Sequence, residues 1–527
     1  KVSQILNFKK NYFYYFLFLY SICGIFLSLN VGITHDEYHN FFVGEANKKK
    51  ILDIFFSTNY QLKPLEGLNL HYGSGFHLLS LPIDYILNLF FTLKHVSLES
   101  QSILIKHPSV FIFFALSGIY FRKIIFIITS NKDYSSLCTV LYLIYPYLLG
   151  HSFFNIKDIP FLSVWLICTY YIISIAKSFY KEKKIKNKYF IILGILSAYL
   201  LSIRITGILI FIEYLIFFIL TINISKFDYF VFFKLFYKKI ILFFLLTLSL
   251  FYFLSPSYWS NPLEVINGII MMSQHIQTVC TVTLGECMKA QNLPSSYLPI
   301  WLFFKLPILI LFGLIYLILN EKSFFSPSLN GIIITSILGS TLLIILLLIL
   351  FNVNLYDEIR QVMFLIPLIF IISMASIFIL PKKISYSFIG VFIIFFIFQN
   401  IKIYPYNYVW LNNLTHFTQV NNKFELDYWG VSSKKIANFF NIKNIKSNEC
   451  IISNRNRGIK DFIQNKDNCF LPFQDLHKKN TRPFYVALME RGINKGLPNN
   501  CKNIHNEKIN INFSKESLIM ARVFKCD

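Results

Sequence analysis

The sequence is poor in charged residues. They make up 15% of its 527 residues, whereas hydrophobic residues make up 55% and aromatic residues 18%. Soluble domains carry roughly 25% charged residues, so this composition excludes an ordinary soluble protein. Many apolar runs are about 20 residues long, which is the length needed to cross the hydrocarbon core of a bilayer. The sequence therefore predicts a polytopic membrane protein.

Two further features are missing. The sequence shows no internal repeat with a period of roughly 20–50 residues and no low-complexity linker. The first apolar run, Asn11 to Val31, also lacks a small-x-small cleavage site and is too long for a signal-peptide core. We therefore expect this run to be retained as the first membrane span, with the N-terminus inside.

The basic residues report on topology rather than on a nucleic-acid partner. The formal net charge is +23, but the lysines cluster in short loops between apolar runs, as the positive-inside rule predicts. We therefore expect membrane lipids as partners and no nucleic acid. With the basic loops placed inside, the outside loops are 32–72, 154–159, 204–206, 257–297, 354–360 and everything after 402.

These features predict an all-α polytopic membrane domain over 1–402 and a small extracytoplasmic α/β domain over 403–527. By the twenty-residue criterion we expect about eleven spans. The apolar segment Gly73–Leu93 would reverse every later loop if it crossed, so we expect it to be re-entrant or to lie on the surface. The expected spans are 11–31, 108–128, 134–153, 160–178, 189–203, 207–222, 239–256, 298–318, 329–353, 361–380 and 384–402.

Most of the cysteines fall outside the expected spans. Six of the nine lie in segments assigned to the outer face, where an oxidising compartment allows disulfides. Cys280 and Cys287 are close enough in sequence to staple the 257–297 loop, and the tail has enough cysteines for two more bridges. Pairing within the tail does not follow from sequence, and free thiols are the alternative.

The outside loops hold an unusual set of charged residues. Asp36 and Glu37 follow the first span, Lys157 and Asp158 directly precede another, and Arg204 and Arg360 lie in two later outside turns. Charges at membrane depth are costly unless they face a cavity or a partner. One outward-facing cavity would accommodate all six. Carboxylates suit general-base chemistry, and arginine and lysine suit a phosphate.

Each of these residues also has a plain structural explanation. A carboxylate beside a span end is usually just solvated, Lys157 could pair with Asp158, Arg360 could pair locally, and Arg204 could reach lipid headgroups. His35 and His39 could bind a metal if they lie on one helix, but no third ligand is evident.

Taken in order, the motifs resemble those of the GT-C membrane glycosyltransferases. The similar branch contains dolichyl-phosphate-mannose–protein mannosyltransferases and bacterial aminoarabinose–lipid A transferases. The resemblance covers about residues 1–435. It is carried by Asp36-Glu37, Phe154-Asn155-x-Lys157-Asp158-x-Pro160, Ser255-Pro256-x-x-Trp259-x-Asn261-Pro262, Leu293-Pro294-x-x-Tyr297-x-Pro299-x-Trp301, Tyr356-Asp357-x-x-Arg360 and Phe424-Glu425-Leu426-Asp427-Tyr428-Trp429-Gly430.

The resemblance implies an inverting transferase that moves a sugar from a polyprenyl-phosphate donor to a lipid, glycan or protein acceptor. It implies that Asp36 is the catalytic base, with Glu37 beside it, and that Asp158 is the acid of the second loop. Arg360, Lys157 and Arg204 would bind the donor phosphate. The short 257–297 loop leaves no room for the large insert of eukaryotic protein mannosyltransferases. We therefore expect a protein of a bacterial cell membrane, with its active site on the extracytoplasmic side.

No cofactor is required by this scheme, because the donor already carries an activated leaving group. Some GT-C branches use a divalent metal, so one remains compatible with the sequence. Two other classes of protein also fit a polytopic chain: a transporter or flippase for a lipid-linked or anionic substrate, and a membrane scaffold whose C-terminal domain binds envelope partners.

Overall fold

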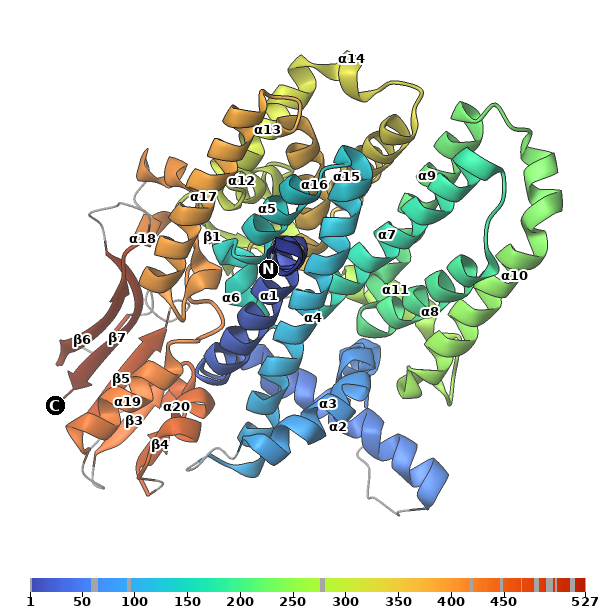
Figure 1. Ribbon diagram of the computed structural model, residues 1–527. Coiled ribbons are helices and arrows are strands. Elements are labelled where there is room, and N and C mark those ends of the chain that lie inside the picture. The colour runs from blue at the N-terminus through green and yellow to red at the C-terminus, as the bar shows by residue number, and fades with distance from the viewer. Residues whose placement is uncertain are drawn as a thin grey trace.

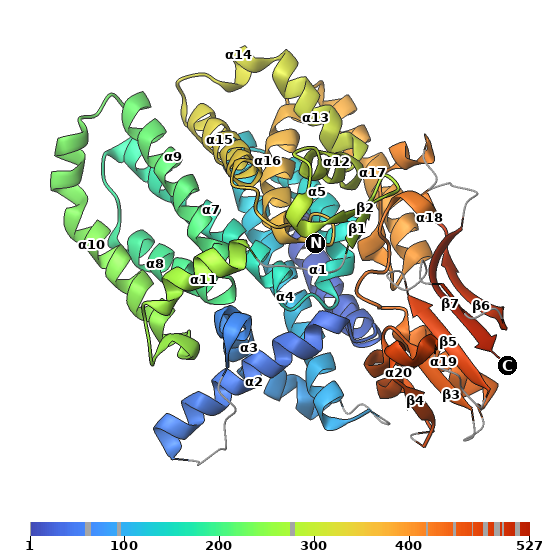
Figure 2. The ribbon, with the colours of Figure 1, turned by 180° about the vertical axis from the view of Figure 1, so that it is seen from behind.

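The computed structural model describes residues 2–57, 65–91, 96–274, 280–417, 420–445, 449–465, 467–477, 483–489, 496–497, 500–511 and 517–526. A helical body makes up most of the molecule, and a small sheet lies at one side of it (Figure 1). Seen from behind, α2 and α3 project from the body at the lower left, while the sheet lies at the right (Figure 2).

The helical body contains long apolar helices. Within the described residues, seven are long and apolar enough to cross a membrane, or eight if one bent pair counts as a span. Their apolar windows are Tyr12–Leu29 in α1 (Val2–Leu29), α4 (Leu98–Thr129), α7 (Asp158–Glu182), Ile205–Ile224 with α9 (Ile210–Ile224), α15 (Leu329–Leu350), Arg360–Ile377 with α16 (Ile366–Ile377), and α17 (Lys382–Ile403).

The expected count of about eleven spans is not confirmed, and prolines explain part of the difference. The predicted span 134–153 is divided into α5 (Lys132–Leu143) and α6 (Pro146–Ser152). The predicted span 298–318 is α12 (Tyr297–Lys305) and α13 (Ile308–Leu319), which meet at 114° across Leu306 and Pro307. Proline lacks the backbone N–H of a helix interior, so it is accommodated at the start of a helix rather than within one.

Other helices are shorter or support the body. The segment expected to be re-entrant contains α3 (Gly75–Phe90), which at 16 residues is short of a full crossing. The remaining helices are α2 (His35–Phe56), α8 (Asn187–Ile203), α10 (Tyr229–Phe253), which packs along α8, α11 (Glu264–Ser273), α14 (Glu321–Phe324) and α18 (Val420–Lys423).

A buried ionic network joins α3 to α4. Lys106 Nζ lies 2.5 Å from Asp84 Oδ2 and donates to Ser80 Oγ at 3.0 Å, while Ser109 donates to Asp84 Oδ1 at 2.6 Å. Asp84 and Lys106 are 9% and 2% exposed. The lysine and the carboxylate therefore neutralise each other inside the body.

The C-terminal domain is a mixed sheet with two helices, which confirms the predicted small α/β domain. The strand order is β4-β3-β5-β7-β6; β3 is parallel to β4 and β5, and β7 is antiparallel to β5 and β6. The elements are α19 (Ser433–Lys443), β3 (Cys450–Ser453), α20 (Asn456–Phe462), β4 (Cys469–Leu471), β5 (Phe484–Met489), β6 (Cys501–Ile509) and β7 (Leu518–Cys526). A separate hairpin of β1 (Cys280–Thr283) and β2 (Glu286–Lys289) precedes α12.

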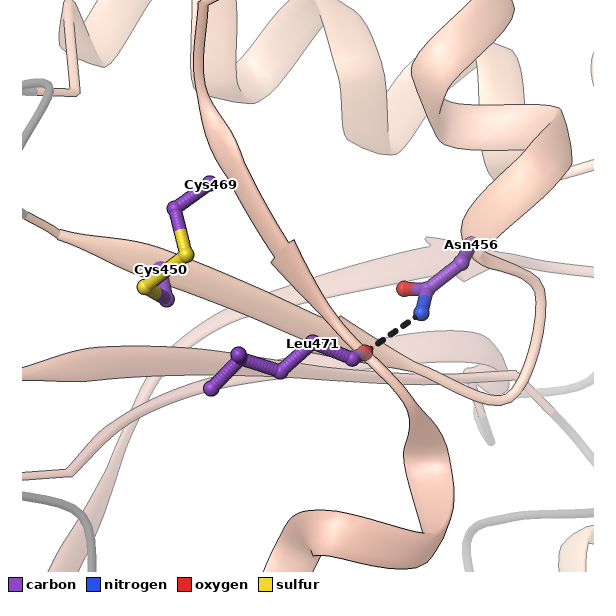
Figure 3. Close-up of a disulfide and its surroundings, with 4 residues drawn as sticks. All are labelled: Cys450, Asn456, Cys469 and Leu471. Carbon is purple, nitrogen blue, oxygen red and sulfur yellow. Dashed lines mark hydrogen bonds between the residues drawn. A yellow bond between two sulfur atoms is a disulfide. The ribbon is translucent and has the colours of Figure 1, made fainter.

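Two disulfides staple this sheet, as the cysteine count of the tail allowed. Cys450 bonds to Cys469 across the parallel pair β3–β4, and Asn456 at the start of α20 donates to the Leu471 carbonyl close by (Figure 3). Cys501 bonds to Cys526 across β6–β7. Cys287 is also disulfide-bonded, but the predicted pairing with Cys280 involves a side chain outside the described residues.

The hydrophobic cores do not divide at residue 402. Buried residues from Tyr406 to Val431 belong to the core of the helical body, whereas the core between the sheet and α19 and α20 begins at Ile436. The stretch that follows α17 therefore packs as part of the helical body before the chain enters the C-terminal sheet.

Candidate active site

Five of the six charged residues selected from the sequence line one pocket. The pocket is partly open to solvent. The residues brought together are Asp36, Lys157, Asp158, Arg204 and Arg360; Asn40, His71, Tyr72, Gly73, Asn155, Ile205, Thr206, Met272, Tyr356, Gln361 and Trp429 complete the lining. Glu37 does not line it.

These side chains lie at the ends of helices. Asp36 lies in the first turn of α2, and Asp158 is the first residue of α7. Carboxylates are stabilised there because the N-terminus of a helix carries partial positive charge. Arg204 ends α8, and Arg360 begins the short 3₁₀ segment η5 (Arg360–Leu365).

Asp36 is the accessible carboxylate of the pocket. Its side chain is 35% exposed, and its Oδ2 lies 3.3 Å from the Arg360 guanidinium. Its backbone is fixed by the helix, since the Asp36 carbonyl accepts from Asn40 Nδ2 at 2.9 Å. The carboxylate thus faces the pocket with room for a further hydrogen-bond partner.

Asp158 is, by contrast, enclosed by donors. Its side chain is 2% exposed and bridges Arg204, which it contacts closely, and Arg360, whose Nη1 is 3.5 Å away. Asn155 Nδ2 donates to the same carboxylate at 3.1 Å, and Asn155 Oδ1 accepts from the Asp158 amide at 2.8 Å. This carboxylate joins two cations to the start of α7.

Arg360 is held from several sides. Its Nε and Nη2 lie 2.9 Å and 2.8 Å from Asp357 Oδ2, and its guanidinium lies 5.0 Å and 4.8 Å from the ring centres of Tyr356 and Trp429. Contacts of this kind with aromatic faces favour a cation. The guanidinium is therefore fixed in orientation before any ligand enters.

The turn before Arg360 has an unusual backbone. Asp357 and Glu358 both have positive φ, 58° and 63°. Such conformations cost of order 1–3 kcal/mol each in non-glycine residues. The turn directs Asp357 toward Arg360 and Glu358 toward Lys305, whose Nζ is 2.8 Å away in a fully buried ion pair.

Lys157 is the cation of the pocket without a carboxylate partner among the described residues. Its ammonium lies 3.9 Å from the centre of the Tyr72 ring. Desolvation, together with the neighbouring positive charge of Arg204, lowers the pKa of Lys157 to about 7. An entering anion would restore the charged form, because opposite charge favours ionisation.

Glu37 points away from the pocket into the protein. It is 2% exposed, accepts from the Thr34 amide at 2.7 Å, and lies 2.6 Å from His107 Nε2. The other ring nitrogen of His107 is 3.0 Å from the Ser28 carbonyl, which can only accept. A single proton must therefore lie between Glu37 and His107, and this pair fixes the start of α2 to α4.

The described residues contain no group of three His, Cys, Asp or Glu side chains arranged to hold a metal ion. His35 and His39 do lie on one helix, as a metal pair would require, and the His39 ring packs edge-on against Tyr72 at 4.6 Å.

Sequence reasoning missed several residues of the site. Tyr72, which supports Lys157, lies in an outside loop that offered no charge to attract attention. His107, the partner of Glu37, lies directly before the predicted span 108–128 and proves to be inside α4, where its ionisable ring was a signal that could have been used. Trp429 was noted as part of a motif, but its place over Arg360 depends on how the chain returns after α17.

Comparisons with known proteins give a likeness to solved structures but not to any protein family. No protein-family model matches the chain, and no curated protein matches it either. Among solved structures, the chain is similar to a crystal structure of ArnT from Cupriavidus metallidurans bound to undecaprenyl phosphate. The sequences are 9% identical, the alignment covers 98% of each chain, and the TM-score is 0.47.

Proposed function

We propose that the protein is an inverting glycosyltransferase that takes a sugar from a polyprenyl-phosphate donor and passes it to an extracytoplasmic lipid, glycan or protein. The observation that carries this proposal is the pocket, in which an accessible carboxylate faces a fixed guanidinium and an ammonium that forms no ion pair with a carboxylate among the described residues. A base beside a phosphate-binding cation is what sugar transfer from a lipid phosphate needs. The order of the sequence motifs supports the same chemistry.

The donor phosphate is assigned first to Lys157 and then to Arg360. Both arginines are already engaged by carboxylates, Arg204 by Asp158 and Arg360 by Asp36, Asp158 and Asp357. The Lys157 ammonium lies over the Tyr72 ring and forms no ion pair with a carboxylate in the part of the chain that the structure describes. A phosphate entering the pocket would therefore gain most from Lys157, while Arg360 contributes an oriented positive charge near the same position.

Asp36 is assigned as the base and Asp158 as a positioning residue. Asp36 takes the proton from an acceptor hydroxyl or amine while the oxygen or nitrogen attacks the anomeric carbon. The bond between that carbon and the phosphate oxygen breaks, and the lipid phosphate leaves as an anion beside Lys157 and Arg360. Cations placed in advance stabilise the charge that develops on the leaving group. Glu37 takes no part, because His107 and the Thr34 amide occupy its oxygens.

The position of the charges favours a transferase over a transporter. Asp36, Asp158, Arg204 and Arg360 all lie at ends of helices, rather than at interruptions halfway along them. Transporter sites are typically formed by discontinuous helices near the middle of the membrane. The charged pocket of this chain instead opens where loops and helix ends meet.

The proposal is tested by mass spectrometry of envelope lipids and glycans from cells that lack the protein. Wild-type protein supplied from a plasmid should restore the missing glycoform, and Asp36→Asn should not, although it accumulates in the membrane normally. Asp53→Asn, on the same helix but outside the pocket, is the matched control and should restore it. Full restoration by Asp36→Asn would refute the assignment of the base.

A further inference from the structure

The chain at the start of α19 contacts the turn that precedes Asp36. The His35 amide donates to the Trp429 carbonyl at 3.1 Å, and Lys434 Nζ donates to the Asn30 carbonyl at 2.8 Å. At Gly32 the two backbones approach so closely that a Cβ would lie 2.9 Å from the Val431 carbonyl oxygen. The turn between α1 and α2 therefore rests against the start of the C-terminal domain (Figures 1 and 2).

Tyr38 is the strongest point of this contact. It is 6% exposed, its hydroxyl donates to the Asp461 carboxylate, and the Arg457 guanidinium lies 4.0 Å from the centre of its ring. Asp461 and Arg457 both belong to α20. Arg457 also pairs with Glu99 at the start of α4, at 2.6 Å, but both of those side chains are about half exposed.

An apolar cluster surrounds the same contact. Ile33 and Tyr38 pack with Ile103 and Leu104 of α4, and Phe462 at the end of α20 covers the group. The Tyr38 ring is therefore buried against apolar side chains, while Arg457 over the ring stays about half exposed.

Helix geometry connects this contact to the pocket. Tyr38 follows Asp36 by two residues on α2, which places the two side chains about 200° apart around the helix axis. Asp36 faces the pocket and Tyr38 faces α20. The C-terminal domain thus contacts the first turn of α2 on the side opposite the Asp36 side chain. The Asp36 carboxylate itself pairs with Arg360.

We propose that Tyr38, Arg457 and Asp461 are positioning residues for Asp36, and that the C-terminal domain serves to hold the base at the distance that proton transfer requires. This inference rests on the proposed function of Asp36. A displacement of about 1 Å can lower the rate of a reaction by about 100-fold. Loss of one contact out of several should therefore slow the chemical step without altering the phosphate-binding residues on α7 and η5.

The test compares Tyr38→Phe, Asp461→Ala and the double variant. Each single variant should lower kcat about 10-fold while binding of undecaprenyl phosphate stays within about twofold of wild type. Because both changes remove the same contact, the double variant should be no slower than the slower single variant. Arg457→Leu should slow transfer as well, and Arg457→Lys should restore part of the rate because it keeps a cation over the ring. Glu99→Gln removes only the exposed ion pair and should behave as wild type.

Hydrogen exchange separates this inference from the proposed function. Amides of residues 35–40 should exchange faster in Tyr38→Phe and Asp461→Ala than in wild type or Glu99→Gln. Faster exchange in these variants would confirm the contact. If the wild-type protein at the same time transferred sugar from no polyprenyl-phosphate donor, the proposed function would be refuted. Unchanged exchange and unchanged kcat in both variants would overturn the positioning role, as would a loss of phosphate binding equal to the loss of kcat.

Discussion

Two clusters of charge in the helical body differ in what they leave available. Between α3 and α4, Lys106 and Asp84 are paired with each other and with serine hydroxyls, and both are buried. In the pocket at the ends of α2 and α7, Asp36 is one-third exposed and Lys157 has no carboxylate partner among the described residues. The first cluster is complete by itself, whereas the second has an acceptor and a cation to offer a ligand.

This difference separates structural charge from functional charge in a membrane protein. Buried charge is costly in both places, so its presence alone does not identify a site. What distinguishes the pocket is that Asp36 remains within reach of solvent and that Lys157 forms no ion pair with a carboxylate among the described residues. The same kind of substitution should therefore have different effects in the two clusters.

The largest effect is expected at Asp36. Asp36→Asn keeps the size of the side chain but removes the base, so the rate of release of undecaprenyl phosphate from a polyprenyl-phosphoryl sugar should fall by about 10³-fold. The melting temperature in detergent should stay within about 2 °C, since an exposed carboxylate contributes little to stability. A much lower melting temperature of Asp36→Asn would indicate that Asp36 has a structural role, like Asp84.

At Asp84 the pattern should reverse. Asp84→Asn leaves the Lys106 ammonium buried without its counter-charge, which costs about 3–5 kcal/mol of folding free energy. Thermal unfolding in detergent should show this loss, and the protein that remains folded should bind undecaprenyl phosphate as wild type does. The double variant Asp84→Leu/Lys106→Met should recover most of the stability. Equal instability of the single and double variants would count against the pairing.

Lys157 should control donor binding rather than stability. Lys157→Met removes the ammonium that has no carboxylate partner and should weaken binding of undecaprenyl phosphate by about 10–100-fold, from the roughly 1.5–3 kcal/mol of a charged hydrogen bond. Lys48→Met on α2, whose ammonium pairs with Glu45 at 2.8 Å outside the pocket, is the matched control. Unchanged binding in Lys157→Met would mean that the arginines, and not Lys157, bind the phosphate.

A smaller effect is expected from pH. Because the pKa of Lys157 is lowered to about 7, the empty pocket carries the charged ammonium below that pH and loses it above. Binding of an anion raises this pKa, so affinity should fall by up to about tenfold per pH unit above 7. A polyprenyl phosphodiester, which does not titrate in this range, is the suitable probe. Lys157→Arg should remove the dependence, and a pH-independent wild type would contradict it.

Much of the architecture followed from local pattern. Runs of apolar residues indicated the long helices. The number of cysteines in the tail indicated that two disulfides could form there. Charged residues beside predicted spans share one pocket. Helix ends explain this success. Residues next to spans are confined to one of two levels, because the thickness of the membrane fixes where each spanning helix begins and ends.

Partner choice could not be predicted, because it depends on contacts between distant segments. Asp36 and Glu37 are adjacent and chemically alike, yet one faces the pocket and the other faces His107, 70 residues away in sequence. The same holds for Tyr38 and Asp461, which are 423 residues apart. The expected span count is not confirmed where prolines divide an apolar run, since hydropathy does not register a bend.

The central claim is that Asp36 performs proton transfer while other residues bind the phosphate. The most direct measurement determines, on one preparation of Asp36→Asn, both the dissociation constant for undecaprenyl phosphate and the rate of sugar transfer. We expect the dissociation constant to stay within about twofold of wild type or to become lower, because a negative charge near the phosphate is removed, while transfer falls about 10³-fold. Transfer by Asp36→Asn at a near wild-type rate would contradict the account.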